Sequence, residues 1–189
     1  MMAEPLVASE QLDPLAKLIR DGAYRDAVAL AAREHGAALG RLCMAMLGSQ
    51  AEAEEATQEA LIAAFDSMAS YRGEGSVKAW LLGIARRICA RRVETRVRRE
   101  NRLRLVYDAG AEAQLPDEEV ERRRRAERLR AAMEHLRPSE REALLMRYGQ
   151  GLSFKEVGEA CGIDEAAARK RASRGLCQLR TVLSGESKP

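Results

Sequence analysis

The sequence predicts an all-α protein made of two small helical domains joined by a linker. Aromatic residues make up only 4% of the 189 residues, while the helix-forming residues Ala, Leu, Arg and Glu dominate the composition. Apolar residues recur at helical spacing along most of the chain. This periodicity lapses over residues 105–116, "LVYDAGAEAQLP", so the linker is expected there.

Charge is segregated along the chain although the net charge is only +3. Acidic residues concentrate within residues 52–59 and 117–121, and arginines within residues 86–104 and 122–130. Local electrostatic fields therefore matter more for binding partners than the total charge does.

The four cysteines, Cys43, Cys89, Cys161 and Cys177, show neither Cys-x-x-Cys nor zinc-ligand spacing. We interpret them as small buried or half-buried hydrophobic residues, with a redox-active thiol as the alternative, and expect no metal and no cofactor. The chain shows no signal-peptide pattern and no apolar run near the roughly 20 residues that span a bilayer. A cytoplasmic protein without membrane insertion is expected.

The first domain is expected over residues 12–104, after an N-terminal tail of residues 1–11. Helices are predicted over residues 12–34, 36–47 and 51–68, the second with an apolar stripe and the third with Leu61, Phe65 and Met68 on one face. Ser76 is the expected N-cap of a fourth helix, which continues into an arginine-rich stretch. The stripe of the second helix is Leu39, Leu42, Cys43, Met46 and Leu47, and the seam of the fourth is Trp80, Leu81, Ile84, Ala85 and Ile88.

The second domain is expected over residues 117–189. Asp117 is a candidate cap for a helix that ends before Pro138, with Ala126, Leu129, Met133 and Leu136 as its buried stripe. Two capping boxes are predicted, Ser139 with Glu142 and Ser153 with Glu156. A short helix over residues 154–160, a glycine turn at 161–163 and a second helix capped by Asp164 form a predicted helix-turn-helix.

The second helix of this motif separates into two faces at 100° per residue. Ala168, Ala172, Leu176, Leu179 and Leu183 form the side expected to pack on the domain. The candidate DNA-contacting face carries Ala167, Lys170, Arg171, Arg174 and Gln178, with Arg169 at its border and suited to phosphate. A solvated basic face on a bundle helix is the alternative interpretation.

Three stretches together carry a family resemblance. They are "EAEEATQEALIAAF" (52–65), "YRGEGSVKAWLLGIARRICARR" (71–92) and "LRPSEREALLMRYGQGLSFKEVGEACGI" (136–163). In order and spacing they resemble the extracytoplasmic-function sigma factors of bacterial RNA polymerase. The resemblance implies that residues 12–104 form a region 2-like domain and residues 117–189 a region 4-like helix-turn-helix domain.

The resemblance also implies a role for each charged segment. The acidic helix would dock on the polymerase β′ coiled coil, the loop and helix over residues 67–92 would meet the promoter −10 element, and the helix-turn-helix would read the −35 element. Arg87 stands where the family commonly has Asn, so an Asn-mediated base contact does not carry over. The implied docking residues are Glu52, Glu54, Glu55, Gln58 and Glu59; the implied −10 residues are Tyr71, Arg72, Ser76, Lys78, Arg86, Arg87 and Arg91.

The predicted function is therefore promoter-specific transcription initiation. The expected partners are core RNA polymerase, through its β′ coiled coil and β flap, and promoter DNA, with an anti-sigma factor as a further candidate. A helix-turn-helix regulator that binds DNA as a dimer without polymerase is the alternative. No enzymatic activity is expected, because His35 and His135 lack partners at ligand spacing and no phosphate loop or nucleophile motif is present.

Overall fold

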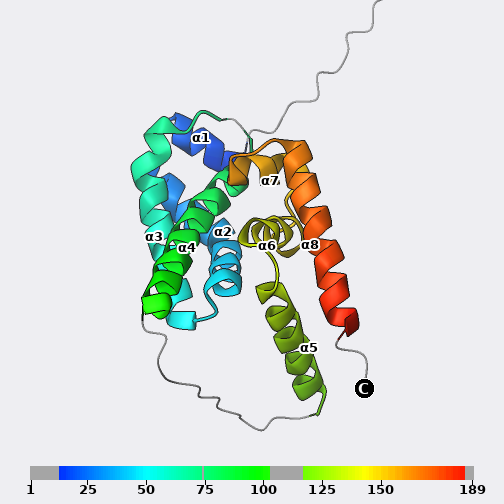
Figure 1. The fold of residues 1–189 in the computed structure, drawn as a ribbon. Coiled ribbons are helices and arrows are strands. Elements are labelled where there is room, and N and C mark those ends of the chain that lie inside the picture. The colour runs from blue at the N-terminus through cyan, green and yellow to red at the C-terminus, as the bar shows by residue number, and fades with distance from the viewer. Residues whose placement is uncertain (1–12, 74, 103–116, 186–189) are drawn as a thin grey trace, which may run out of the picture.

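The structure of the chain is a computed structural model that describes residues 13–73, 75–102 and 117–185, with backbone alone at 99–102 and 117–123. Within these ranges every regular element is a helix, which confirms the all-α prediction. Two helical groups pack side by side, α1 to α4 in one and α5 to α8 in the other (Figure 1). The predicted tail 1–11 and linker 105–116 lie outside the described residues.

The first group consists of four α-helices and one 3-10 turn. Ser49 caps α3 through its side chain, and Ser76 caps α4, because the Ser76 hydroxyl accepts the Ala79 N–H at 3.2 Å. The elements are α1 (Pro14–Arg20), α2 (Tyr24–Leu47), α3 (Gln50–Ser67), η1 (Met68–Ser70) and α4 (Val77–Arg102).

The first helix break lies elsewhere than predicted. The pattern indicated one helix over residues 12–34 and a break near Gly36, but the chain breaks at Gly22, which has a φ of +75°, and α2 runs through Gly36. A glycine inside a helix costs about 1 kcal/mol relative to Ala, and burial of neighbouring apolar residues of α2, such as Ala31 and Leu39, offsets this cost.

The core of the first group depends on small residues in α3. Four alanines, Ala53, Ala56, Ala60 and Ala64, form its fully buried face. The prediction that grouped Phe65 with buried Met68 was wrong, because the Phe65 side chain is 38% exposed. The seam of α4 is confirmed: Leu81, Ile84, Ala85 and Ile88 are buried, and half-buried Trp80 lies 5.0 Å from the Tyr71 ring, centroid to centroid.

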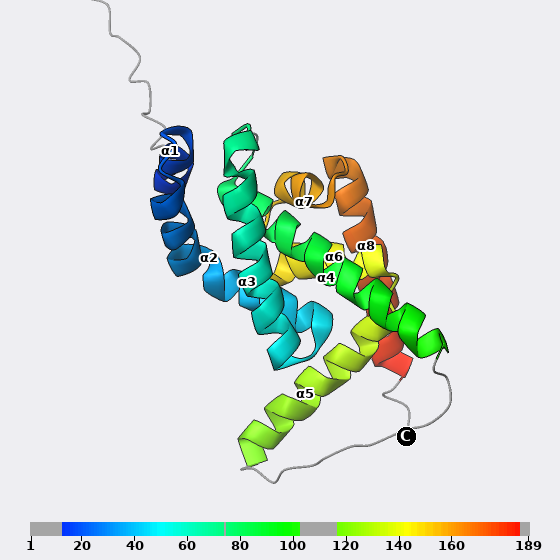
Figure 2. The ribbon, with the colours of Figure 1, turned by 90° about the vertical axis from the view of Figure 1, so that its left-hand side faces the viewer.

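The second group consists of α5 (Asp117–Glu134), α6 (Pro138–Leu144), the π-helical turn η2 (Leu145–Gly149), α7 (Phe154–Cys161) and α8 (Glu165–Gly185). The stripe predicted for α5 was half wrong. Leu136 is buried and Met133 half-buried, but Ala126 and Leu129 are exposed. The reason is visible in Figure 2, where the first turns of α5 extend away from the other helices.

One predicted capping box is absent. Arg137 is the N-cap of α6, and its side chain makes no cap hydrogen bond, because a guanidinium has no atom that can accept one. Pro138 begins the helix, so Ser139 lies inside it and is not the cap. Glu142 consequently points elsewhere, to a partner in the first group. No described helix of this chain is long and apolar enough to cross a membrane.

Candidate nucleic-acid interface

The helix-turn-helix forms with the predicted caps. Ser153 and Glu156 make a complete capping box at the start of α7, and the Asp164 carboxylate accepts the Ala167 N–H at 2.6 Å at the start of α8. Gly162 in the turn has a φ of +68°, a region that glycine adopts without strain. At Gly158 a Cβ would lie 2.7 Å from the Ile163 carbonyl oxygen, so only glycine fits there without a shift.

The outward face of α8 is cationic and open. Lys170 and Arg174 are exposed and form no ion pair among the residues that the structure describes, while Arg171 is half-exposed. Ala168, Ala172 and Gly175 pack into the domain, which confirms the predicted separation of faces.

Three further residues of the predicted face are held by contacts or partly buried. The Arg169 guanidinium bonds Glu165 at 2.7 Å and stacks 4.7 Å from the centroid of the Phe154 ring. Gln178 donates to the backbone carbonyl of His135 at 2.7 Å, which ties α8 to the end of α5, and Ala167 is half-buried. Arg169 is thus held in one orientation at the edge of the face.

A groove between α3 and α4 gathers three of the predicted −10 residues. Its volume is about 540 Å³, and Arg86, Arg87 and Arg91 lie along it beside the apolar side chains of Ile84 and Ile88. Cations along an apolar wall suit a nucleic-acid strand whose bases leave the stack. The structure thus brings these three arginines together around one surface.

The other predicted −10 residues lie in the loop before α4 and in its first turn. The Tyr71 hydroxyl donates to the Gly75 carbonyl at 3.0 Å, and Arg72 is exposed. Burial, followed by the charges of Asp13 and Glu159, raises the pKa of Tyr71, so its hydroxyl stays protonated at neutral pH. Ser76 and Lys78 follow at the start of the helix.

The N-terminal half of α4 is in contact with the second group of helices, chiefly with α7. Arg86 supplies most of the polar contact: Nη1 binds Glu142 Oε2 at 3.0 Å, and Nε donates to the Ala160 carbonyl at 3.3 Å. Two shorter contacts join the beginning of α4 to the same group. The Ser76 hydroxyl donates to Glu156 Oε1 at 2.6 Å, and Lys78 Nζ donates to the Gln150 carbonyl at 2.7 Å.

These contacts between the two helical groups shift the pKa of the Glu156 carboxyl group. Burial raises the pKa of Glu156, but the hydrogen bonds from Ser76 and Ser153 outweigh burial and lower it below its ordinary value. Glu156 therefore serves both the capping box and the contact with α4. Sequence reasoning found the first role from local spacing and missed the second, because a contact 80 residues away leaves no local pattern.

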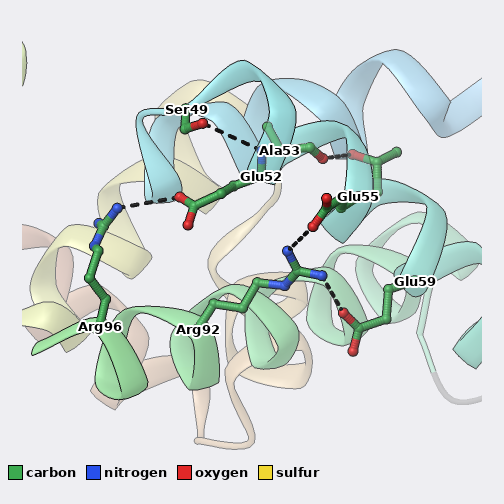
Figure 3. Close-up of polar contacts among 8 residues, drawn as sticks. Ser49, Glu52, Ala53, Glu55, Glu59, Arg92 and Arg96 are labelled. Atoms are coloured by element: carbon green, nitrogen blue, oxygen red, sulfur yellow. Dashed lines mark hydrogen bonds and ion pairs between the residues drawn. The ribbon is translucent and has the colours of Figure 1, made fainter. Parts of the chain in front are cut away.

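Three of the predicted docking glutamates are bound within the first group (Figure 3). Arg92 of α4 lies between Glu55 and Glu59, with nitrogen–oxygen distances of 3.1 and 2.8 Å, and Arg96 lies 3.4 Å from Glu52. The excess arginines of α4 therefore neutralise one side of α3. These glutamates join α3 to α4 and are only partly available to a partner.

The opposite side of α3 has a different character. Glu54 and Gln58 line a second groove of about 480 Å³, whose other wall is formed by Ala37, Gly40 and Met44 of α2. Further along α3, Ile62 and Phe65 are 63% and 38% exposed. The spacing Glu54, Gln58, Ile62, Phe65 places a polar and then an apolar contact surface along the helix. The sequence analysis did not include Ile62 and Phe65 among the docking residues. The sequence does carry a signal for them, because both are apolar and follow the exposed residues Glu54 and Gln58 at helical spacing.

The cysteines agree with the interpretation as small buried or half-buried residues except at Cys177, which is exposed. Cys43 and Cys89 are buried and hydrogen-bond each other across α2 and α4, and this bond, with burial, raises the pKa of Cys89. Among the described residues, no group of three or more His, Cys, Asp or Glu side chains is placed to hold a metal ion.

Comparison with known proteins identifies the two helical groups. A family model for Sigma-70 region 2 matches residues 31–102, and a model for Sigma-70, region 4 matches residues 126–179. The chain belongs to the extracytoplasmic-function sigma factors. The first helical group is therefore region 2, and the group containing the helix-turn-helix is region 4.

Curated relatives carry this family's name. The sigma factor SigE of Mycolicibacterium smegmatis is 33% identical over 161 residues, which cover 82% of this chain and 61% of that protein. SigX of Bacillus subtilis is 26% identical over 140 residues, covering 71% of this chain and 72% of that protein. The chain thus spans less than two thirds of the length of SigE.

Two solved structures share the fold. CnrH, in complex with the cytosolic domain of CnrY, aligns with a TM-score of 0.67 at 21% identity and covers 92% of this chain and 97% of CnrH. The sigma factor RpoE of Bartonella quintana, in complex with the anti-sigma factor NepR, aligns with a TM-score of 0.63 at 21% identity and covers 86% of this chain and 97% of RpoE. Both likenesses support a fold of two helical domains.

Proposed function

We propose that this chain binds core RNA polymerase and directs initiation at promoters by contacting a −35 and a −10 element. One observation carries the proposal: the chain presents two separate cationic surfaces, the outer face of α8 in region 4 and the α3–α4 groove in region 2. Membership in the sigma factor family supports it. The two surfaces differ in shape, which fits duplex reading in one case and single-strand binding in the other.

Region 4, taken as residues 117–189, is proposed to read the −35 element. The N-terminal half of an exposed helix such as α8 fits a major groove about 12 Å wide, where Arg side chains pair with guanine edges. Arg171 and Arg174 are the proposed base readers, with Lys170 and the stacked Arg169 on phosphates. Ala167 allows close approach, and Gln178 supports the position of α8 through His135.

Region 2, taken as residues 12–104, is proposed to hold the −10 element in single-stranded form. Arg86, Arg87 and Arg91 would bind strand phosphates along the groove. Tyr71, Arg72, Ser76 and Lys78 would extend this surface to the loop before α4. Arg87, in place of the family's common Asn, favours phosphate contact over amide-specific base contact.

Polymerase docking is proposed on the side of α3 that faces away from α4. Glu54 and Gln58 would supply polar contacts, and Ile62 and Phe65 the apolar centre, to a helix of the β′ coiled coil. Glu52, Glu55 and Glu59 would contribute through residual negative charge. Region 4 is proposed to contact the β flap, and the linker 105–116 to connect the two domains along the polymerase in the cytoplasm.

An anti-sigma factor is a further proposed partner. The structure of CnrH contains the cytosolic domain of CnrY, and the structure of RpoE contains the anti-sigma factor NepR. Sigma factors as a class are not enzymes. A regulator that acts without polymerase is not favoured, because region 2 has no counterpart in a simple helix-turn-helix repressor.

Run-off transcription tests the proposal directly. Purified core polymerase, with and without the chain, is offered a library of promoter templates with varied −35 and −10 sequences. The expected result is initiation that depends on the chain and on both elements. Initiation on no template, or binding of the free chain to a palindromic duplex as a dimer, would contradict the proposal.

A further inference from the structure

Two cysteines form a thiol pair in the core of region 2, and the proposed function uses neither of them. Cys43 lies on α2 and Cys89 on α4, and both side chains are fully buried. The Cys89 thiol donates a hydrogen bond to the Cys43 sulfur, so the two side chains are in contact. A single buried thiol is an ordinary small apolar group, but two thiols in contact are placed to form a disulfide.

The surroundings make the two thiols chemically unequal. The hydrogen bond from Cys89 lowers the pKa of Cys43 although burial opposes the shift, and the charge of Arg92 lowers it further. The same hydrogen bond, together with burial, raises the pKa of Cys89. Cys43 is therefore the thiol that ionises, and Cys89 keeps its proton beside it. A thiolate with a second thiol in contact is the arrangement that reacts with oxidants and then forms a disulfide.

The thiol pair lies behind both grooves of region 2. Met44, which follows Cys43 in α2, lines the groove between α2 and α3. Ile88 and Ala90, which flank Cys89 in α4, line the groove between α3 and α4. The proposed function assigns the first groove to polymerase and the second to the −10 strand. A movement of α2 relative to α4 at the thiol pair therefore changes the shape of both grooves.

The Cys43 thiol is also close to the surface of the molecule. Thr57 is half-buried, lines the groove between α2 and α3, and hydrogen-bonds Cys43. One layer of side chains thus separates the sulfur atom from the groove. Local opening of the helices is enough to admit an oxidant that is little larger than a water molecule. Hydrogen peroxide has this size.

We propose that Cys43 and Cys89 form a peroxide-reactive site, whose oxidation to a disulfide joins α2 to α4 and lowers initiation by the chain. The Cys43 thiolate attacks one oxygen of a hydroperoxide, the O–O bond breaks, and the leaving oxygen takes up the proton that Cys43 released. The Cys89 sulfur then attacks the resulting sulfenic acid, and its proton leaves with the hydroxyl group as water. The two thiols lose two electrons, and the hydroperoxide gains them.

The loss of initiation rests on the proposed function, whereas the thiol chemistry does not. A covalent bond between two sulfurs is shorter than a hydrogen bond between them, so α2 and α4 must approach or rotate as it forms. The alanine face of α3 packs against both helices, and a close-packed core does not absorb such a movement without shifting its neighbours. Both grooves are therefore distorted in the oxidised chain.

The test oxidises the full chain before polymerase is added. A Cys177→Ser background removes an exposed thiol that would join two chains. Hydrogen peroxide is added at neutral pH and then destroyed with catalase, and peptide mass spectrometry locates the modified residues. The expected product is a disulfide between Cys43 and Cys89, with a mass lower by two hydrogen atoms. Cys161 should stay a thiol, because burial raises its pKa.

Two single variants in this background are the matched controls. In Cys89→Ala, peroxide should add one oxygen atom to Cys43, whereas in Cys43→Ala it should leave Cys89 unmodified. Run-off transcription with core polymerase measures the consequence. The oxidised background chain should lose most of its activity, and Cys43→Ala should keep its activity through the same treatment. Dithiothreitol should restore the background chain, which separates a disulfide from methionine oxidation, a change that requires methionine sulfoxide reductases for its reversal.

The outcomes distinguish failure of the inference from failure of the proposed function. The inference is overturned if peroxide that oxidises Cys177 in the wild-type chain produces no disulfide between Cys43 and Cys89. It is also overturned if the disulfide leaves run-off transcription unchanged, or if Cys43→Ala loses as much activity as the background chain. Failure of the reduced chain to initiate on any template overturns the proposed function, and the peptide masses still decide whether the two thiols form the site.

Discussion

The helices α4 and α8 are both rich in basic residues, but they differ in what these residues contact. Basic side chains of α4 bind other parts of the chain, whereas those of α8 are exposed. On α4, Arg86 and Lys78 are bound by region 4 and Arg92 and Arg96 by the glutamates of α3. On α8, Lys170 and Arg174 are exposed and form no ion pair among the described residues. A count of arginines therefore does not locate a DNA-binding surface; the partners of each guanidinium do.

The largest expected effect separates the two helices functionally. Arg174→Ala should weaken binding of the free full chain to duplex −35 DNA by roughly 5- to 150-fold, the equivalent of 1–3 kcal/mol for a bidentate base contact. The reason is that α8 is open before polymerase binds. Equilibrium binding by fluorescence anisotropy at fixed salt provides the measurement.

Arg87→Ala is the counterpart on α4. It should leave duplex binding by the free chain unchanged and lower run-off transcription by the holoenzyme, because its groove acts only after promoter opening. Equal effects of both variants on the free chain would contradict the difference between the helices. Loss of core polymerase binding in either variant would show that the assigned roles are wrong.

The second effect concerns the close approach that supports α8. Gly158→Ala should destabilise the chain by about 1–3 kcal/mol, because its Cβ would lie 2.7 Å from the Ile163 carbonyl oxygen and overpacking costs that much. Chemical denaturation followed by circular dichroism gives the free energy of unfolding. The transition of region 4 should shift to lower denaturant concentration.

Gly36→Ala is the matched control in region 2. A Cβ at Gly36 meets nothing within 4 Å, so alanine should stabilise α2 by about 0.5–1 kcal/mol. Opposite signs for the two glycines would support the packing described for each. Destabilisation by Gly36→Ala would mean that α2 is broken there, as the sequence pattern first indicated.

The third effect tests whether the cations of α4 next to α3 are structural. Arg92→Ala removes two hydrogen bonds, to Glu55 and Glu59, from a partly exposed ion pair, and should lower the free energy of unfolding by about 1 kcal/mol. Arg91→Ala is the control, since its distance to Glu59 is 4.0 Å and its side chain is exposed. A strand-binding loss with Arg92→Ala larger than that with Arg91→Ala would place Arg92 on the DNA surface instead.

Local sequence signals predicted the helix-turn-helix correctly because each of its determinants lies within a few residues of its partner. Ser153 with Glu156, Gly162 in the turn and Asp164 before α8 are such signals. The errors arose where tertiary packing decided the structure. The alanine face of α3 suits close approach by α2 and α4, so larger Phe65 is left outside, and Gly36 stays helical because its neighbours are buried.

Glu142 is the most informative error. It stands three residues after Ser139, the spacing of a capping box, yet it binds Arg86 of region 2, 56 residues earlier in the chain. Local spacing cannot distinguish these outcomes, because both satisfy the carboxylate. The same limit applies to the docking prediction, which included both Glu54 and Glu55. Adjacent residues on a helix lie on different faces. Only the structure shows that Glu54 lines the groove beside α2, while Glu55 binds Arg92 of α4.

The smallest expected effect is pH-dependent and lies beside the covered end of α4. Burial lowers the pKa of His35 from 6.5, and Lys78 lowers it further, while Glu34 and Asp13 oppose the shift. The unfolded chain therefore binds the proton more readily, so the cost of protonating His35 is absent well above pH 6.5 and grows as the pH falls below it.

Thermal melts between about pH 7.5 and about pH 5.5 should show wild-type stability falling, and His35→Gln should flatten part of this slope. A slope in His35→Gln as steep as that of the wild-type chain would mean that protonation of His35 does not destabilise the fold.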